Sequence, residues 1–357
     1  MKKKFAFILT IAMLLGLLSG CAGTTVVYYD ECTCPAGSHE TEPGKDDETE
    51  AAPAPAEGAL KTGLAVLTSV AKSESAKQAD YDVTLVAVTV DDKGVIQSCI
   101  IDSIGTQVTF DEKGTITADL SADILSKNEL GDAYGMKAYG GSKYEWYEQA
   151  AALADYAVGK TVDELKNGAI DESGKAKEGT DLATTASIYL GGYVSAIEAA
   201  VENAKHLGAQ GGDELRLAAI SKIDGSVSAT AEKDGTAQLD CDVTAITVNG
   251  GKITSCYIDS LQAKVGFDTT GTITTDLTAP VQTKNQLGEG YGMKAWGGAK
   301  YEWNEQAAAF AKYVTGKTAA EVAGIAVSEG KATDADLASS VTIAIGGFQA
   351  LIDKAMR

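Results

Sequence analysis

Two stretches of the chain carry side chains suited to holding or accepting a ligand, and each stretch occurs twice. A hydroxyl-rich segment reads Asp-Leu-Ala-Thr-Thr-Ala-Ser over residues 181–187 and Asp-Leu-Ala-Ser-Ser-Val-Thr over residues 336–342. A loop rich in glycine and aromatic residues covers residues 134–146 and returns 157 residues later, from Tyr291. Hydroxyl oxygens can carry a phosphoryl group, and aromatic faces can stack on a flat ring. These segments therefore form the candidate site of each copy.

The aromatic loop has the residue types that hold a planar ligand. Aromatic faces and a methionine can enclose a flat ring, and a lysine can face a phosphate or another anionic group. The candidates are Met136, Lys137 and Tyr139 in the first copy and Met293, Lys294 and Trp296 in the second. The competing interpretation places the aromatics in the core. For Tyr144 and Trp146 we favour the core, whereas for Tyr139 and Trp296, beside Gly-Gly pairs, both interpretations stay open.

Other reactive residue types do not form a repeated catalytic set. The chain has two histidines, His39 and His206, at positions that do not correspond, which excludes catalysis by a repeated histidine. Cys99 and Cys256 occupy strand positions where a thiol packs as a small hydrophobic group. The pair Cys32 and Cys34 offers a weak redox or soft-metal site. These residues therefore predict that the protein is not an enzyme.

The N-terminal region predicts secretion and a lipid anchor. Lysines at 2–4 precede an apolar run over residues 5–18, and Leu-Ser-Gly-Cys at 18–21 has the form of a lipoprotein cleavage site. We expect residues 1–20 to be the signal peptide and Cys21 to carry the lipid. Residues 21–59, rich in Glu, Asp, Pro and Ala, are expected to be a flexible acidic tether. This predicts a lipid-anchored protein on the extracellular face of the cell membrane.

The chain is strongly acidic. Its formal net charge of −20 becomes −23 once the three lysines of the leader are removed. A surface of this charge repels phosphate backbones, so nucleic acid is excluded as a partner. Metal ions and basic surfaces remain open.

An internal repeat divides the rest of the chain into two parts of similar length. Nineteen residues from Tyr134 return from Tyr291 with three differences, and Cys-Ile-Ile-Asp-Ser at 99–103 returns at the same offset as Cys-Tyr-Ile-Asp-Ser. A period this long indicates duplicated domains and not stacked short repeats. We therefore expect one domain over residues 60–207 and a second over residues 208–357.

Within each copy, strands are expected to precede helices. Runs of β-branched residues predict strands over 83–90, 95–101, 243–248 and 253–258, with shorter strands near Val108, Ile116, Val265 and Ile273. Helices are expected over 144–158, 193–205 and 348–356, and Thr161-x-x-Glu164 and Thr318-x-x-Glu321 predict capping boxes. The hydroxyl-rich segments also fit strands that end at a Gly-Gly turn. The fold class is therefore α+β, a twisted antiparallel sheet with packed helices.

On these residues the chain resembles the FMN-binding domain family of secreted bacterial flavoproteins. The family signature, Asp-x-x-Ser/Thr-Gly-Ala-Thr, is matched in type by Asp181, Thr184, Ala186 and Ser187, and by Asp336, Ser339 and Thr342. The resemblance implies that Ser187 and Thr342 each receive FMN through a phosphoester made by an FMN transferase. The chain departs from the signature at the glycine, which is Thr185 or Ser340, and at the alanine, which is Val341 in the second copy.

Within that family, the chain looks most like the two-domain, lipid-anchored flavoproteins of extracellular electron transfer in Gram-positive bacteria, whose signal peptides also serve as pheromone precursors. The resemblance implies up to two covalent FMN groups. It also implies a membrane dehydrogenase and quinone pool as electron donor, with metal ions or soluble compounds as acceptors. One alternative is a cofactor-free surface lipoprotein whose aromatic loops bind a cell-wall glycan, a peptide or a small ligand. Another is a structural surface protein with a pheromone-bearing leader.

Overall fold

The computed structural model describes residues 58–357, and each half of this region folds around a three-stranded antiparallel sheet. In the first half, residues 58–207, the strands are β1 (Lys61–Ser69), β2 (Gln78–Val90) and β3 (Ile96–Thr109). In the second half, residues 208–357, they are β4 (Glu214–Lys222), β5 (Gly235–Asn249) and β6 (Lys252–Phe267). Both sheets connect neighbouring strands in sequence order. The predictions on the leader, Cys21, Cys32, Cys34 and tether residues 21–57 lie outside the described residues. The tether was predicted to continue to residue 59, but Ala59 forms an isolated bridge with Gln210.

The helices follow the strands in the same order in both halves. The first half has α1 (Lys127–Leu130), η1 (Gly131–Tyr134), α2 (Trp146–Ala157), α3 (Val162–Ala169), α4 (Asp181–Thr185) and α5 (Gly191–Glu202). The second half has α6 (Lys284–Leu287), η2 (Gly288–Tyr291), α7 (Trp303–Val314), α8 (Ala319–Ala323), α9 (Ala335–Ser340) and α10 (Gly346–Met356), with a short hairpin of β7 (Val327–Ser328) and β8 (Lys331–Ala332). The α+β class is as predicted. Within residues 58–357, no helix combines the length and apolar character needed to cross a membrane.

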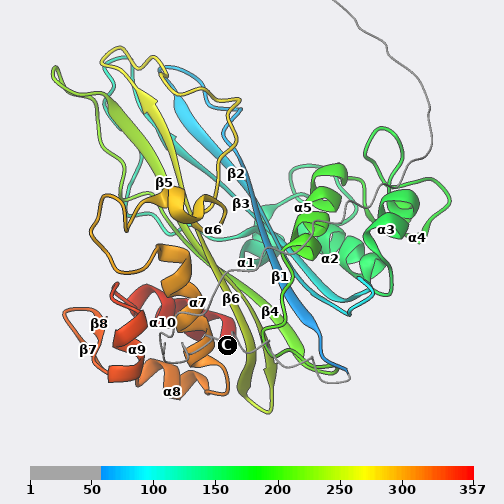
Figure 1. Ribbon diagram of the computed structural model, residues 1–357. Helices are drawn as coiled ribbons and strands as arrows, with labels where there is room; N and C mark the ends of the chain where they lie inside the picture. The colour runs from blue at the N-terminus through cyan, green and yellow to red at the C-terminus, as the bar shows by residue number, and fades with distance from the viewer. Residues whose placement is uncertain (1–57) are drawn as a thin grey trace, which may run out of the picture. The chain divides into compact units, whose positions relative to one another are not determined.

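Each sheet is buried on both faces. Val83, Leu85 and Ala87 of β2 belong to a hydrophobic cluster shared with β4, β5 and β6. Their neighbours Val86 and Val88 point the other way and pack with the helices of the first half. Side chains alternate across a strand, so a strand covered on both faces is apolar throughout. The result is a layered arrangement in which the two sheets face each other and each carries its own helices outside (Figure 1).

Equivalent residues of the two halves meet in the shared core. Phe110 and Phe267, which are 157 positions apart, stack with ring centroids 4.1 Å apart and planes 5° from parallel. Close beside them, a Cβ on Gly114 would lie 2.5 Å from the Asp268 carbonyl oxygen. A Cβ on Gly271 would lie equally close to the Asp111 carbonyl oxygen. Both glycines also have positive φ, so these turns require glycine. The halves share one compact unit, and the boundary at residues 207 and 208 stays a prediction.

Several predicted elements differ from those observed. The strand expected over 95–101 continues to Thr109, so Val108 belongs to β3 and Ile116 makes only an isolated bridge to Phe110. The second half behaves alike, with Val265 inside β6 and Ile273 bridging Phe267. The alternation of buried and exposed side chains simply persists past the expected strand end. Strands β1 and β4 were not predicted, because Ala, Lys and Glu in them disfavour strand formation.

The hydroxyl-rich segments form short helices, so the strand interpretation of them is wrong. The side chain of Thr180 caps α4 by accepting the Ala183 N–H, and Asp334 caps α9 by accepting the Leu337 N–H. These N-cap residues, followed by leucine and alanine, favour a helical turn over a strand. The other helix signals are confirmed, including both capping boxes at Thr161 and Thr318.

A buried aspartate at the same place in each half predicts a pH effect on stability. Asp102 and Asp259 each accept two backbone N–H groups, and burial raises the pKa of both above the ordinary 3.8. A carboxyl whose pKa is higher in the folded than in the unfolded state lowers the free energy of unfolding of the protein as the pH rises above 3.8. We expect the double variant Asp102→Asn and Asp259→Asn to gain stability relative to the wild type between about pH 4 and 7 in urea unfolding. A difference that stays constant over this range would contradict the assignment.

Candidate functional site

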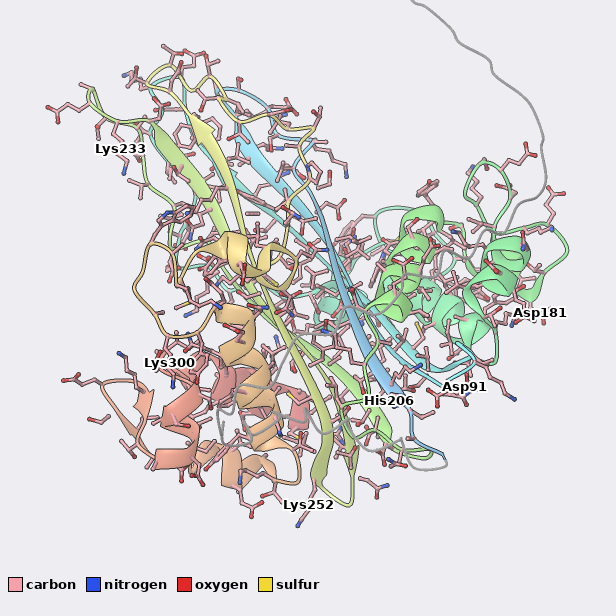
Figure 2. All side chains as sticks on the ribbon, viewed as in Figure 1. Asp91, Asp181, His206, Lys233, Lys252 and Lys300 are labelled. Carbon is pink, nitrogen blue, oxygen red and sulfur yellow. The ribbon has the colours of Figure 1, made fainter. Side chains whose placement is uncertain are left out.

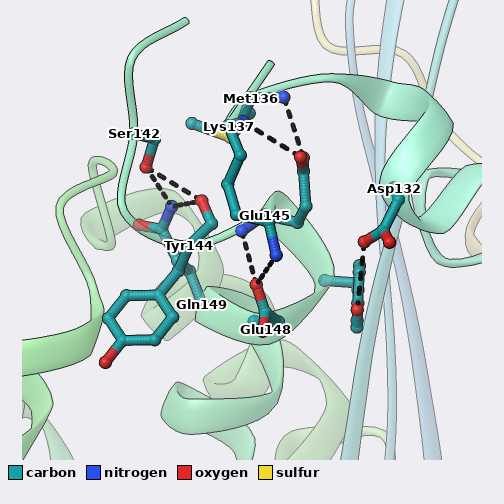
Figure 3. Close-up of polar contacts among 9 residues, drawn as sticks. Asp132, Met136, Lys137, Ser142, Tyr144, Glu145, Glu148 and Gln149 are labelled. Carbon is teal, nitrogen blue, oxygen red and sulfur yellow. Dashed lines mark hydrogen bonds and ion pairs between the residues drawn. The ribbon is translucent and has the colours of Figure 1, made fainter.

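A buried glutamine joins the aromatic loop to the hydroxyl-rich segment in the first half. Gln149 has no exposed surface. Its Nε2 donates to the Tyr144 carbonyl oxygen at 3.0 Å and to Ser142 Oγ at 3.2 Å (Figure 3). Its Oε1 accepts from the Ser187 N–H at 2.7 Å, from Ser187 Oγ at 3.2 Å and from the Ile188 N–H at 3.2 Å. The candidate acceptor is therefore held directly beside the base of the aromatic loop.

The second half repeats this arrangement. Gln306, also fully buried, donates to the Tyr301 carbonyl oxygen at 2.9 Å. It accepts from the Thr342 N–H at 2.8 Å, from Thr342 Oγ1 at 3.1 Å and from the Ile343 N–H at 3.2 Å. Two segments separated by about forty residues in sequence thus converge in the same way twice. The glutamines were not among the predicted site residues, although both lie within the repeated nineteen-residue stretch.

A buried glutamate fixes the start of each aromatic loop. Glu145, 1% exposed, accepts the N–H groups of Met136 at 2.8 Å and Lys137 at 2.9 Å (Figure 3). Its own N–H donates to Glu148, and this bond, together with the ion pair to Lys137, lowers the pKa of Glu148. Glu302 holds Met293 and Lys294 in the same way, and Lys294 pairs with Glu305. The two predicted lysines therefore pair with carboxylates in the first turns of α2 and α7, and their role toward a phosphate stays a prediction.

The loop aromatics divide into core and surface residues. Trp146 is 2% exposed and donates its Nε1–H to Tyr193, which confirms its assignment to the core. Tyr139 and Trp296, in contrast, are 92% and 85% exposed. The Trp296 ring covers Gly292, where a Cβ would lie 2.5 Å from the ring. In the same way, the Tyr139 ring covers Gly135. Each loop thus presents an aromatic ring that rests on glycine backbone and is otherwise open to solvent.

Both candidate acceptors are accessible. Ser187 and Thr342 are exposed residues. The signature hydroxyls before them are engaged within their helices, because Thr184 donates to the Asp181 carbonyl oxygen and Ser339 to that of Asp336. Thr185 and Ser340, which stand where the family signature has glycine, are the last residues of α4 and α9. Their backbone therefore does not require glycine in this chain.

The two halves differ beside the acceptor. Tyr189, 61% exposed, lies two residues after Ser187. Its side chain covers Gly174 and Gly191, where a Cβ would lie 2.3 Å from a ring carbon and 2.5 Å from the phenol oxygen, respectively. The second half has Ala344 near Gly330 in this place, with no ring. The first half therefore offers a second exposed aromatic surface that the second half lacks.

The strand cysteines are packed as predicted. Burial raises the pKa of the Cys99 and Cys256 thiols to about 12, so both are protonated near neutral pH. Cys241 of β5 is buried with a pKa raised to about 12 as well. Among the described residues, no group of three or more His, Cys, Asp or Glu side chains is arranged to hold a metal ion.

Comparison with curated proteins gives a partial match to a protein named chlorophenol reductase from Desulfitobacterium hafniense. The two are 32% identical over 128 residues, which are 32% of this chain and 39% of that protein. The chain therefore spans well under half of the relative's length. No protein-family model matches the chain, and no solved structure matches it significantly.

Proposed function

We propose that the protein is an extracellular, lipid-anchored electron carrier that holds FMN covalently on Ser187 and Thr342. The observation that carries the proposal is the repeated geometry around Gln149 and Gln306. In each half an exposed hydroxyl is held by a buried amide that also holds the aromatic loop. A duplicated carrier would keep one such attachment point in each copy.

The residues present fit the group. A phosphoester needs an accessible hydroxyl. Its Oγ would bond to the FMN phosphorus as the phosphoanhydride bond of an activated flavin nucleotide breaks, and the released nucleotide would carry away the hydroxyl proton. Ser187 and Thr342 are exposed enough for a transferase to reach them. Exposed rings at Tyr139, Tyr189 and Trp296 offer faces on which a flat heterocycle can stack. Bound FMN supplies reversible uptake of electrons.

The proposed partners follow from location. A lipid on Cys21 and the acidic tether would hold residues 58–357 outside the membrane, within reach of a membrane dehydrogenase and quinone pool. The FMN transferase is the partner required for loading. Metal ions or soluble compounds are the proposed acceptors, and no substrate turnover at the protein itself is required.

Absorbance at the flavin bands tests the proposal in protein co-expressed with an FMN transferase. We expect Ser187→Ala and Thr342→Ala each to lower the flavin content by roughly half, and the double variant to lose it, because each half holds one independent acceptor. Ser173→Ala, which removes another exposed hydroxyl of the first half, serves as the matched control and should keep full loading. A colourless wild-type protein with unmodified mass would contradict the proposal.

A second candidate function rests on the exposure of Tyr139 and Trp296. Exposed aromatic rings on twin loops also suit a cofactor-free protein that binds a cell-wall glycan or peptide. This function predicts that flavin-free protein is retained on isolated cell wall. The double variant Tyr139→Ala and Trp296→Ala should then lose retention, while the double variant Ser187→Ala and Thr342→Ala keeps it. Equal retention of both variants would contradict this function.

A further inference from the structure

A cleft between the two halves lies apart from both acceptor hydroxyls. We call it the α7 cleft, and its volume is about 870 Å³, within the range of small-molecule sites. Its floor is Cys256–Asp259 of β6, one wall is α7, and the other is the connector of residues 203–207 (Figure 2 labels His206 there). Neither Ser187 nor Thr342 lines it.

Comparison of the two halves shows that the α7 cleft has lost negative charge. Gln286 and Lys312 line the cleft, and the positions 157 residues earlier are Glu129 and Asp155. One carboxylate has thus become a neutral amide and another a lysine. Lys205, from the connector, adds a second ammonium group, which lies 5.1 Å from the centre of the Tyr257 ring. The lining thus places two lysines, Lys205 and Lys312, against two carboxylates, Asp259 and Glu305.

The negative groups of the cleft are already satisfied. Asp259 is 8% exposed and accepts the N–H groups of Ser260 and Asn285. Glu305 is paired with Lys294 at 3.1 Å. His206 lies 3.0 Å from Asp92 and is committed to that contact. Lys312, in contrast, has no ion pair among residues 58–357.

Asn304 adds an unpartnered acceptor. Its Oδ1 is buried and makes no hydrogen bond with the described part of the chain, and the residue lines the cleft. The equivalent residue of the first half is the bulky Tyr147, whose hydroxyl contacts Asp132. A buried acceptor without a partner is costly unless a ligand or water donates to it. The change from tyrosine to asparagine therefore both opens space and supplies a binding group.

The corresponding corner of the first half is bridged. There Lys354 of α10 pairs with Glu129 at 2.6 Å and donates to the Ala219 carbonyl oxygen at 2.6 Å. Helices α5 and α10 both begin with a Gly-Gly pair. When the two helices are aligned on this pair, Ala199 of α5 corresponds to Lys354 of α10. The α7 cleft has no equivalent bridge to Gln286 and is the larger of the two, because the cleft at the corner spanned by Lys354 has a volume of about 600 Å³.

We propose that the α7 cleft binds a small organic anion with a flat apolar body and one hydrogen-bond donor. Lys312 and Lys205 attract its carboxylate, and the Asn304 side chain turns toward the cleft so that Oδ1 accepts from its donor. The flat body contacts Tyr257 and the short side chains of Ala308 and Ala311, which leave room beside the helix. This site is independent of flavin attachment.

Indole-3-acetate is a suitable probe, because it has a flat ring, an N–H donor and a carboxylate. We expect calorimetry with the full mature protein to show binding, weakened roughly tenfold or more for the neutral indole-3-acetamide. Naphthalene-1-acetate, which lacks the donor, should also bind more weakly. Lys312→Asp, which restores the residue type of the first half, should weaken binding roughly tenfold.

The controls separate loss of binding from loss of folding. Asp155→Lys, the matched change in the first half, should leave binding unchanged, and Ala308→Trp should fill the cleft and abolish binding. Thermal unfolding checks each variant, and Lys312→Asp is decisive because Lys312 is an exposed residue whose replacement spares the core. Absence of binding at about 1 mM probe, equal binding of the amide, or wild-type affinity in Lys312→Asp would overturn the proposal.

Discussion

Replacing Phe110 with alanine is expected to lower the free energy of unfolding by about 3–5 kcal/mol. Phe110 is 2% exposed and stacks on Phe267 between the two sheets. Its loss leaves a cavity in the cluster that the two halves share. We therefore expect both halves to unfold in one transition, at a lower urea concentration. Phe267→Ala should have an effect of similar size, since its surroundings are equivalent. Urea unfolding followed by circular dichroism measures both changes.

Two further variants test whether the stacked pair is the cause. Tyr139→Ala removes an aromatic ring that is 92% exposed, and it should change the stability by less than about 0.5 kcal/mol. The double variant Phe110→Ala and Phe267→Ala should be less destabilised than the sum of the single variants, by about 0.5–1.5 kcal/mol. Strict additivity would show that the rings do not support each other. A Phe110→Ala effect as small as that of Tyr139→Ala would contradict a shared core.

Replacing Gln149 with leucine is expected to destabilise the first half by about 3 kcal/mol. The leucine keeps the volume but removes every hydrogen bond of the buried amide, including those to Ser187 and Tyr144. The Ser187 and Ile188 N–H groups then lose their acceptor. Hydrogen exchange should therefore accelerate at residues 187 and 188, while residues 342 and 343 keep their protection.

Gln306→Leu is the matched variant for the second half and should reverse the pattern of exchange. Gln210→Leu, a change at an exposed glutamine, should leave both regions protected. If Gln149→Leu left exchange at residue 187 unchanged, the glutamine would not be the link between loop and acceptor. In that case the geometry that supports the proposed function would lose its basis.

The sequence repeat predicted much of the local structure. The duplicated stretch from Tyr134 led to α2 and α7, and the Thr-x-x-Glu spacing led to both capping boxes, because these signals depend on residues within one helical turn. The apolar runs of β2 and β5 were recognised for the same reason. The ends of the strands were not recognised, since β3 continues past Gly105 to Thr109 although glycine favours a turn.

Contacts between distant segments could not be predicted in this way. The Phe110–Phe267 stack and the shared core depend on two sheets that meet face to face, and no local pattern contains that information. The same holds for Gln149, whose partners at 142, 144 and 187 lie on both sides of it in sequence. A glutamine that is identical in both copies was the available signal. The α7 cleft needed both the fold and the comparison of Asp155 with Lys312.

Intact-mass measurement of the mature protein from its native host tests the central proposal most directly. The account predicts a mass raised by two FMN groups, each attached with loss of water, and peptide mapping that places them at Ser187 and Thr342. A mass that equals the lipidated polypeptide alone, with both residues unmodified, would contradict the flavin carrier and leave the cofactor-free binding function in its place.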